Sequence, residues 1–380
     1  MASKRKDVVF WGWLLDFEDD GSGMAFEKRF LRTDGRTVLE VGTVKPAAYD
    51  FSGVALPTLE DAHSHLADRG LRVRPGMALA DVVRPPDGVK HQYLEAAPPE
   101  EIVANLAAGL NDLVAGGATR THEFREGGMA GAALFRQAQR RLPKERAAHM
   151  APVLLGRPGD IAPPPRGDER AFFRGLDDLL RTCDGLGLSA ISDGDPAWNT
   201  EVARAARARG KVVEVHASEE VREPVDRLLE AGVSQAVHMI RGTGDDFRAL
   251  AEGGVSVAVC TRSNEFFGLR APVRAMVEAG VELRIGTDNA FLGAVDMFEE
   301  ARAFARVHMQ AARLKPIQIV AAMVRRQGIN EGAPIAPREG ARPDLLFLDI
   351  QAERPERDII ARGAREKVTA VVGEQGVSDG

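Results

Sequence analysis

The sequence has little cysteine, and this limits how a metal or redox centre can be built. Only Cys183 and Cys260 occur in 380 residues, and they form no Cys-x-x-Cys pair. A disulfide framework is therefore excluded, and so is a zinc site that needs a Pro-Cys-x-x-Cys segment. Any metal site in this chain has to be built from histidine and carboxylate.

Long apolar runs and basic stretches are also missing. No run of about 18 apolar residues is present, so the sequence predicts no membrane span. The apolar run 8–11 is too short for the apolar region of a signal peptide, and we expect a cytoplasmic protein. The net charge is −6 and no basic stripe stands out, which argues against a nucleic-acid partner.

What is present is an ordinary globular composition, with 44% hydrophobic and 28% charged residues. The length allows one large domain or two smaller ones. Near the N-terminus, Asp34-Gly35 is a hairpin turn signal between two predicted strands. The predicted strands of this region are 8–15, 26–33 and 37–44.

From residue 56 onward, short apolar runs alternate with helical segments. Ile102, Leu106, Leu110 and Leu113 share one face of such a helix. Eight units of this kind predict an α/β protein with a (β/α)8 (TIM) barrel, and the Gly-rich fingerprint of the alternative, a doubly wound sheet, is missing. The apolar runs are 56–62, 117–124, 151–155, 188–191, 212–215, 235–240, 255–260 and 281–285.

The two ends of the chain resemble each other, because 343–349 and 368–372 are again predicted strands. We therefore expect residues 1–55 and 334–380 to form one small β-sandwich beside a barrel of residues 56–333. Two Pro- and Gly-rich loops interrupt the barrel at 69–91 and 157–170. Loops of this length are typical of lids or disordered segments.

Four of the eight histidines lie near the ends of predicted strands, where a barrel carries its functional groups. His63 and His65 end the first strand, and side chains at i and i+2 point to the same face. His216 and His238 lie at the fifth and sixth strands, and Asp288 follows the eighth. We expect these side chains to meet at one rim.

Three histidines and one aspartate suit zinc, with ferrous iron or manganese as alternatives, and leave a position open for water. A metal there would lower the pKa of that water. Glu219 lies three residues after His216 and is near enough to move a proton between water and a leaving atom. The alternative role for Glu219 is to stabilise the following helix at its N-terminus.

These residues resemble the amidohydrolase superfamily, and more narrowly its branch of cytosine deaminase-like and chlorohydrolase-like enzymes. Five motifs occur in order along most of the chain. They are Asp61-Ala62-His63-Ser64-His65, Val215-His216-Ala217-Ser218-Glu219, Ala236-Val237-His238, Val259-Cys260-Thr261-Arg262-Ser263-Asn264 and Gly286-Thr287-Asp288-Asn289.

The resemblance implies one divalent metal bound by His63, His65, His216 and Asp288. It also implies catalytic roles for three residues. Glu219 would protonate the substrate and leaving group, Asp288 would accept the proton of the water, and His238 would orient the hydroxide and the tetrahedral intermediate.

Two departures from the family pattern bear on this reading. Binuclear relatives use a carboxylated lysine at the fourth strand, whereas 189–194 contains no lysine and Lys211 begins its strand at the wrong end. This predicts a single metal. Thr261 stands where the family often has proline, which concerns only the shape of a loop.

Substrate-binding residues are expected around the same rim. Arg125 and Glu126 follow the second strand, just after His122 and Glu123. The candidates are His91, Arg125, Arg157, Asp193 and Asn289, although the charged ones are also compatible with salt-bridged loop residues. His149, His308 and Trp198 are expected to be structural.

The sequence therefore predicts a metal-dependent hydrolytic deaminase that acts on a nitrogen heterocycle, a nucleobase or a nucleoside-like small molecule and releases ammonia. The enzymatic alternatives are a cyclic amide or amidine hydrolase and a triazine-type chlorohydrolase. An alternative of another class is a non-catalytic ligand-binding protein on the same barrel. The sequence leaves the oligomeric state open and is compatible with a homodimer or higher homo-oligomer.

Overall fold

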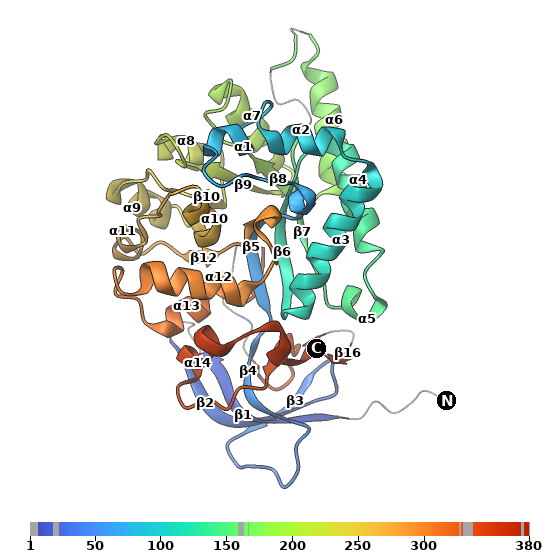
Figure 1. Cartoon of the computed structure of the whole chain (residues 1–380), viewed down its shortest axis with the longest axis vertical. Helices are drawn as coiled ribbons and strands as arrows, with labels where there is room; N and C mark the ends of the chain where they lie inside the picture. Colours follow the sequence, from blue (N-terminus) through green and yellow to red (C-terminus); the bar gives the residue numbers. More distant parts are fainter. Residues whose placement is uncertain are drawn as a thin grey trace.

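Apolar segments in the middle of the chain form the parallel strands of a closed barrel (Figure 1). The computed structural model describes residues 7–17, 23–158, 163–165, 167–326, 328–329, 337–373 and 376–379. The barrel strands are β5 (Leu59–His65), β6 (Ala118–Arg125), β7 (Val153–Gly156), β8 (Gly185–Leu188), β9 (Val212–Ala217), β10 (Gln235–His238), β11 (Ser256–Val259), β12 (Leu283–Ile285) and β13 (Asp288–Asn289).

The barrel closes because β12 and β13 are two pieces of one eighth strand position. The sheet order runs β12-β11-β10-β9-β8-β7-β6-β5-β13, so it begins and ends on the same short segment. In the closing pair, Asp288 is opposite Ser64 and Asn289 is opposite His65. All pairs in this sheet are parallel, which confirms the predicted (β/α)8 barrel.

Helices surround the barrel and bury their apolar faces against it. In α3, the predicted face of Ile102, Leu106, Leu110 and Leu113 is buried. The helices after the barrel strands are α3 (Pro99–Ala115), α4 (Gly128–Gln139), α5 (Lys144–Ala147), α6 (Glu169–Thr182), α7 (Pro196–Arg207), α8 (Val225–Glu230), α9 (Gly244–Glu252), α10 (Thr261–Phe266), α11 (Val273–Glu278), α12 (Met297–Phe304), η3 (Ala305–Met309) and α13 (Pro316–Met323).

The predicted loop 69–91 is not structureless. It carries α1 (Leu79–Val83) and the start of α2 (Val89–Ala96), after the short η1 (Leu66–Gly70). The second long loop, 157–170, lies only partly within the described residues. The remaining helices are η2 (Ala290–Leu292), α14 (Pro355–Arg362) and η4 (Arg365–Lys367). No described helix is long and apolar enough to cross a bilayer.

Strands from both chain ends pair in a second sheet, at the bottom of Figure 1. It has seven strands, in the order β16-β15-β14-β4-β1-β2-β3, and β4 pairs with β14 across the two termini. The strands are β1 (Val8–Phe17), β2 (Met24–Thr33), β3 (Val38–Gly42), β4 (Phe51–Pro57), β14 (Leu345–Leu348), β15 (Val368–Gly373) and β16 (Gly376–Asp379).

This terminal sheet has two apolar faces, because residues alternate along each strand. Phe10 and Phe347 stack with their ring centroids 5.0 Å apart in a small cluster on one face. Leu15, Leu56 and Leu346 point the other way and belong to the main core shared with the barrel. The terminal strands therefore form one continuous sheet fastened to the barrel.

Two predicted strands differ from the structure. The run 56–62 is split at Thr58, whose N–H donates to the Asp344 carbonyl, so residues 56 and 57 lie in the terminal sheet. The fourth barrel strand is β8 rather than 188–191, because glycines at 185 and 187 let it pack closely against its neighbours. The predicted boundary at 333/334 lies outside the described residues.

Gly286 provides a test of barrel closure. A Cβ there would lie 2.8 Å from both the Cβ and the backbone nitrogen of His63. We expect Gly286→Ala to destabilise the protein by about 1–3 kcal/mol, because this overpacking separates the closing strands. Denaturant unfolding measures this change in the free energy of unfolding. Gly175→Ala is the matched control, since nothing lies within 4 Å of that position in α6, and an equal effect of the two changes would contradict the assignment.

Candidate metal centre

Five side chains from four strands meet at the C-terminal rim of the barrel. His63 and His65 come from β5, His216 from β9, His238 from β10 and Asp288 from β13. Their ligand-type atoms form overlapping groups of three in which all atoms lie within 4.8 Å of one another. The structure thus brings together the histidines and the aspartate that the sequence placed at one rim.

The two histidines His65 and His216 face each other with their Nε2 atoms 3.2 Å apart. Nδ1 of His216 donates to the Leu188 carbonyl at 3.0 Å. Nδ1 of His65 lies 3.2 Å from Oε1 of Glu126. Both Nδ1 atoms therefore face acceptors, which favours the tautomers that leave a lone pair on each Nε2.

Two lone pairs at this distance repel each other unless a cation lies between them. A shared proton does not suit the site, because burial lowers the pKa of His65 and lowers that of His216 well below its usual value. Metal-binding histidines commonly use their other ring nitrogen in this way, on a carboxylate or a backbone carbonyl. The arrangement fits a divalent metal.

His63 and Asp288 complete the same cluster. Burial lowers the pKa of His63 to about 3, so its imidazole is neutral. Neither of its ring nitrogens has a hydrogen bond within the described residues, although Nε2 lies 3.3 Å from Oδ1 of Asp288. Burial would raise the pKa of Asp288, but His63 and the other imidazoles hold it well below its usual value. The cluster therefore has a negative charge and, among the described residues, buried imidazole nitrogens without a hydrogen bond, as a cation site requires.

The backbone at this rim is held in strained conformations. Ser218, His238 and Asp288 have φ angles of 49°, 73° and 58°, in the left-handed region. Such conformations cost about 1–3 kcal/mol each and concentrate at functional sites. They turn the side chains at the ends of β9 and β10 and at the start of β13 toward the common centre.

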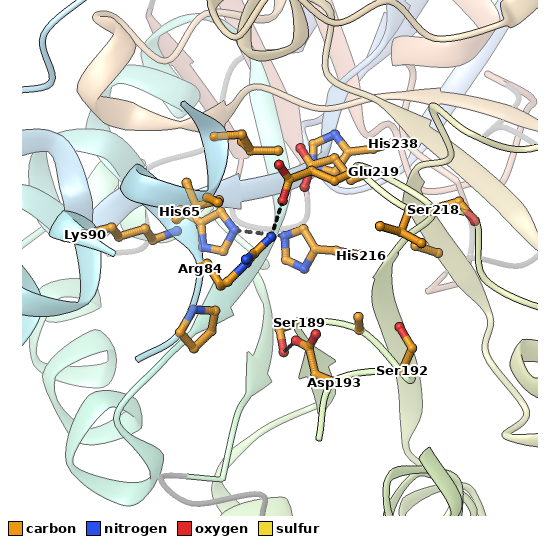
Figure 2. A pocket seen from close by; sticks show the side chains of 18 of the residues that line it. His65, Arg84, Lys90, Ser189, Ser192, Asp193, His216, Ser218, Glu219 and His238 are labelled. Carbon is orange, nitrogen blue, oxygen red and sulfur yellow. Dashed lines mark hydrogen bonds and ion pairs between the residues drawn. The ribbon is translucent and has the colours of Figure 1, made fainter. Parts of the chain in front are cut away.

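Glu219 lies beside this cluster rather than inside it. Its Oε1 is 3.4 Å from Nε2 of His238, and burial raises the pKa of Glu219. Asn264 contacts the other ring nitrogen of His238 at 3.2 Å. Figure 2 shows Glu219 and His238 close together on one side of the pocket. A carboxyl with a raised pKa next to an imidazole is suited to proton transfer.

The cluster opens into a pocket of about 280 Å³. Of the five predicted substrate-binding residues, four line it: His91, Arg157, Asp193 and Asn289. Burial lowers the pKa of His91 to about 4, and its Nε2 lies 3.0 Å from the Val83 carbonyl. Asp193 accepts a hydrogen bond from Ser189.

Arg125 does not line the pocket, contrary to the expectation. It is buried, with its guanidinium 3.1 Å from Glu126 and 3.6 Å from Glu123. His122, also placed near the rim by the sequence, lies deeper in the barrel between Glu214 (2.7 Å) and Glu60 (3.2 Å). Burial opposes its charge, yet these carboxylates raise the pKa of His122 to about 9.

Two charged residues at the site were not among the predicted substrate-binding residues, although the sequence placed Glu126 at the rim after the second strand. Lys90 and Glu126 line the pocket and contact each other at 3.3 Å. Cys260 is a third addition, because its Sγ lies within 4.8 Å of ligand-type atoms of His238 and Asp288. Burial raises the pKa of the Cys260 thiol well above its usual value. The sequence excluded cysteine from the metal site because the two cysteines form no Cys-x-x-Cys pair. Spacing along the chain does not show that Cys260 lies near His238 and Asp288 in the folded protein.

His149, His308 and Trp198 are buried, as expected of structural residues, and do not line the pocket. His149 precedes β7, and His308 lies in η3 with its ring centroid 5.1 Å from that of Phe304. Trp198 packs against Phe172 with ring centroids 5.0 Å apart.

No protein-family model matches the chain. Among curated relatives, a candidate aminohydrolase of Methanothermobacter thermautotrophicus is 27% identical over 333 residues, which cover 83% of this chain and 84% of the relative. The imidazolonepropionase of Sphingopyxis alaskensis is 28% identical over 314 residues, 73% of this chain and 74% of the relative.

Solved structures share the fold over nearly the whole chain. A zinc-bound adenosine deaminase of Xanthomonas campestris has a TM-score of 0.75 at 19% identity, covering 98% of this chain and 92% of that one. Atrazine chlorohydrolase of Arthrobacter aurescens with zinc has a TM-score of 0.73 at 16% identity, covering 97% and 94%. In its relatives, its barrel and its rim of histidines, the chain is similar to proteins of the amidohydrolase superfamily.

Proposed function

We propose that His63, His65, His216 and Asp288 hold one divalent metal, zinc rather than ferrous iron or manganese. The facing Nε2 atoms of His65 and His216 support this most strongly, because a cation between them relieves the repulsion that arises when both Nδ1 atoms carry the proton. Three imidazoles and a carboxylate suit zinc. Such an ion supplies Lewis-acid activation of water and of the substrate carbon.

The function that this site supports best is hydrolytic deamination of a nitrogen heterocycle, a nucleobase or a nucleoside-like small molecule. The observation that carries it is the buried Glu219, whose raised pKa and position beside His238 provide a proton for an amino leaving group. The names of related proteins agree with hydrolysis at carbon–nitrogen bonds.

In the proposed reaction, Asp288, Glu219 and His238 each have a separate role. Water adds to the carbon that bears the amino group, and Asp288 accepts the proton that the water loses. Glu219 delivers a proton to the leaving nitrogen, so the C–N bond breaks and ammonia departs. The added hydroxyl becomes the carbonyl of the product and returns its proton to Glu219, and the proton held by Asp288 passes to the ring nitrogen. His238 donates to the oxygen as negative charge develops on it, in the manner of an oxyanion site.

Arg157 is the pocket residue that we propose for substrate recognition. Burial lowers its pKa, and no described carboxylate lies within ion-pair distance of its guanidinium. The other pocket cations are paired, Lys90 with Glu126 and Arg84 with Glu220. A pocket guanidinium that forms no ion pair with the described residues favours a substrate with an acceptor or anionic group at that position.

The alternatives use the same centre. Hydrolysis of a cyclic amide or amidine agrees with the imidazolonepropionase relatives, and release of halide agrees with the chlorohydrolase fold neighbours. A non-catalytic binding protein has no need of the buried Glu219. Assays for ammonia, ring-opened product and halide separate these reactions on a panel of pterins, purines, pyrimidines, nucleosides and chlorotriazines.

The metal site has a direct test. We expect His216→Ala to lose stoichiometric metal, because one of the two facing imidazoles is removed. Elemental analysis after zinc loading measures the bound metal. His91→Ala is the matched control and should keep the metal, since its ring faces the Val83 carbonyl instead of the cluster. Retention of one zinc per chain by His216→Ala would contradict the ligand set.

The proton-transfer role predicts that Glu219→Gln keeps the metal and lowers kcat for deamination by about 10²–10⁴-fold. The amide has the same shape but has no proton to deliver at neutral pH. Glu220→Gln, next in the chain and paired with the exposed Arg84, should change kcat little. If Glu219→Gln turned over substrate at nearly the wild-type rate, Glu219 would not be the proton donor.

Arg157→Gln tests the recognition role. For the best substrate of the panel, we expect KM to rise by about tenfold or more with kcat less affected, because a charged hydrogen bond worth about 1.5–3 kcal/mol is lost. Asp193→Asn, in the same pocket and bound to Ser189, provides the comparison. If KM is unchanged in Arg157→Gln, the substrate does not contact this guanidinium.

A further inference from the structure

Lys90 is a buried cation beside the candidate metal centre. It lies on α2, in the segment that joins β5 to α3, and only 3% of it is exposed. Its Nζ lies 3.3 Å from Oε1 of Glu126, 3.6 Å from Oδ2 of Asp68 and 3.5 Å from Oδ1 of Asn289. Figure 2 shows it pointing toward His65 from the side.

The three oxygens around Lys90 come from three separate places on the barrel rim. Asp68 follows β5, Glu126 follows β6, and Asn289 directly follows Asp288 in β13. A buried ammonium is costly unless it is paired in this way. Lys90 therefore fastens α2 to the rim beside two of the proposed ligands.

Glu126 is the contact through which Lys90 reaches a ligand. Its Oε1 lies 3.3 Å from Lys90 and also 3.2 Å from Nδ1 of His65. Its Oε2 lies 3.1 Å from Arg125. Arg125 thus holds one carboxylate oxygen, while Lys90 sets the position of the oxygen that faces His65.

The orientation of a ligating imidazole depends on the group at its other nitrogen. We propose that Lys90 is a positioning residue that orients His65 through Glu126, so that docking of α1 and α2 over the pocket completes the geometry of the metal centre. This inference rests on the metal site of the proposed function. Residues 79–96, which carry α1 and α2, are called the lid below.

The lid has the contacts that this role requires. Leu79, Val83 and Arg84 of the lid line the same pocket as the metal centre. Arg84 reaches across to Glu220, with 2.8 Å between nitrogen and oxygen, but both side chains are exposed (65% and 39%). An exposed pair of this kind contributes little to stability. The buried Lys90 is accordingly the contact that joins the lid to a ligand.

Cobalt-substituted protein tests the proposal without any substrate. The visible absorption bands of Co²⁺ report its ligand geometry, and release of Co²⁺ to a chelator reports its affinity. We expect Lys90→Met to shift these bands and to weaken cobalt binding by about 10- to 100-fold, the usual effect of losing a partner of a ligating histidine. Lys90→Arg, which keeps the charge, should restore most of both properties.

Two further variants complete the design. Arg84→Met removes the other lid ion pair and should leave the cobalt spectrum unchanged, because neither Arg84 nor Glu220 contacts a ligand in the described residues. Glu126→Gln keeps the shape of the relay and should shift the bands as Lys90→Met does. Glu126→Gln also tests the proposal if Lys90→Met fails to fold.

The outcomes separate this inference from the proposed function. Wild-type protein that binds cobalt, with Lys90→Met and Glu126→Gln indistinguishable from it, overturns the role of Lys90 and leaves the metal site standing. An equal spectral shift in Arg84→Met also overturns it, since general loosening of the lid would then explain the effect. Wild-type protein that binds no cobalt overturns both proposals.

Discussion

The pairing of β13 with β5 is the contact on which the rest of the site depends. It places Asp288 opposite Ser64, between two histidines that lie more than two hundred residues earlier in the chain. The pairing needs a close approach at Gly286, where a side chain would meet the backbone of His63. Without this closure, the carboxylate of Asp288 and the imidazoles do not lie close together. The proposed metal site therefore depends on the packing of these two strands.

Electrostatics then determine what this centre can hold. The imidazoles of His63, His65 and His216 are kept neutral by burial, and Asp288 remains ionised among them. Below them, His122 lies between Glu60 and Glu214 and carries a charge that these carboxylates neutralise. The barrel interior therefore has a balanced ionic layer beneath a rim that still needs a cation.

The rim is also connected outward to the part of the protein that covers the pocket. Glu126 contacts His65 on one side and Lys90 of the lid on the other. Asp68, after β5, and Asn289, in β13, contact the same ammonium. The proposed metal site and the lid therefore share these contacts.

The sequence by itself determined the periodic features and the chemically distinctive residues. Alternating strands and helices predicted the barrel, and side-chain alternation placed His63 and His65 on one face. Glu219 was identified from its distance along the chain to His216. Each of these depends on local geometry, which repeats every two residues in a strand and every 3.6 in a helix. The start of β8 and the break at Thr58 were placed wrongly, because glycine packing and a hydrogen bond to the distant Asp344 decide them.

Only the tertiary structure decided which charged residues reach the pocket. Arg125 and Arg157 both follow barrel strands, yet Glu123 and Glu126 hold the first inside the protein, while the second has no described carboxylate partner. Lys90 is one charged residue among many in a long loop, and the sequence marked its neighbour His91 rather than Lys90 itself. Its role arises where three separate places on the barrel rim converge, and such convergence is a property of packing, which the order of residues along a chain does not display.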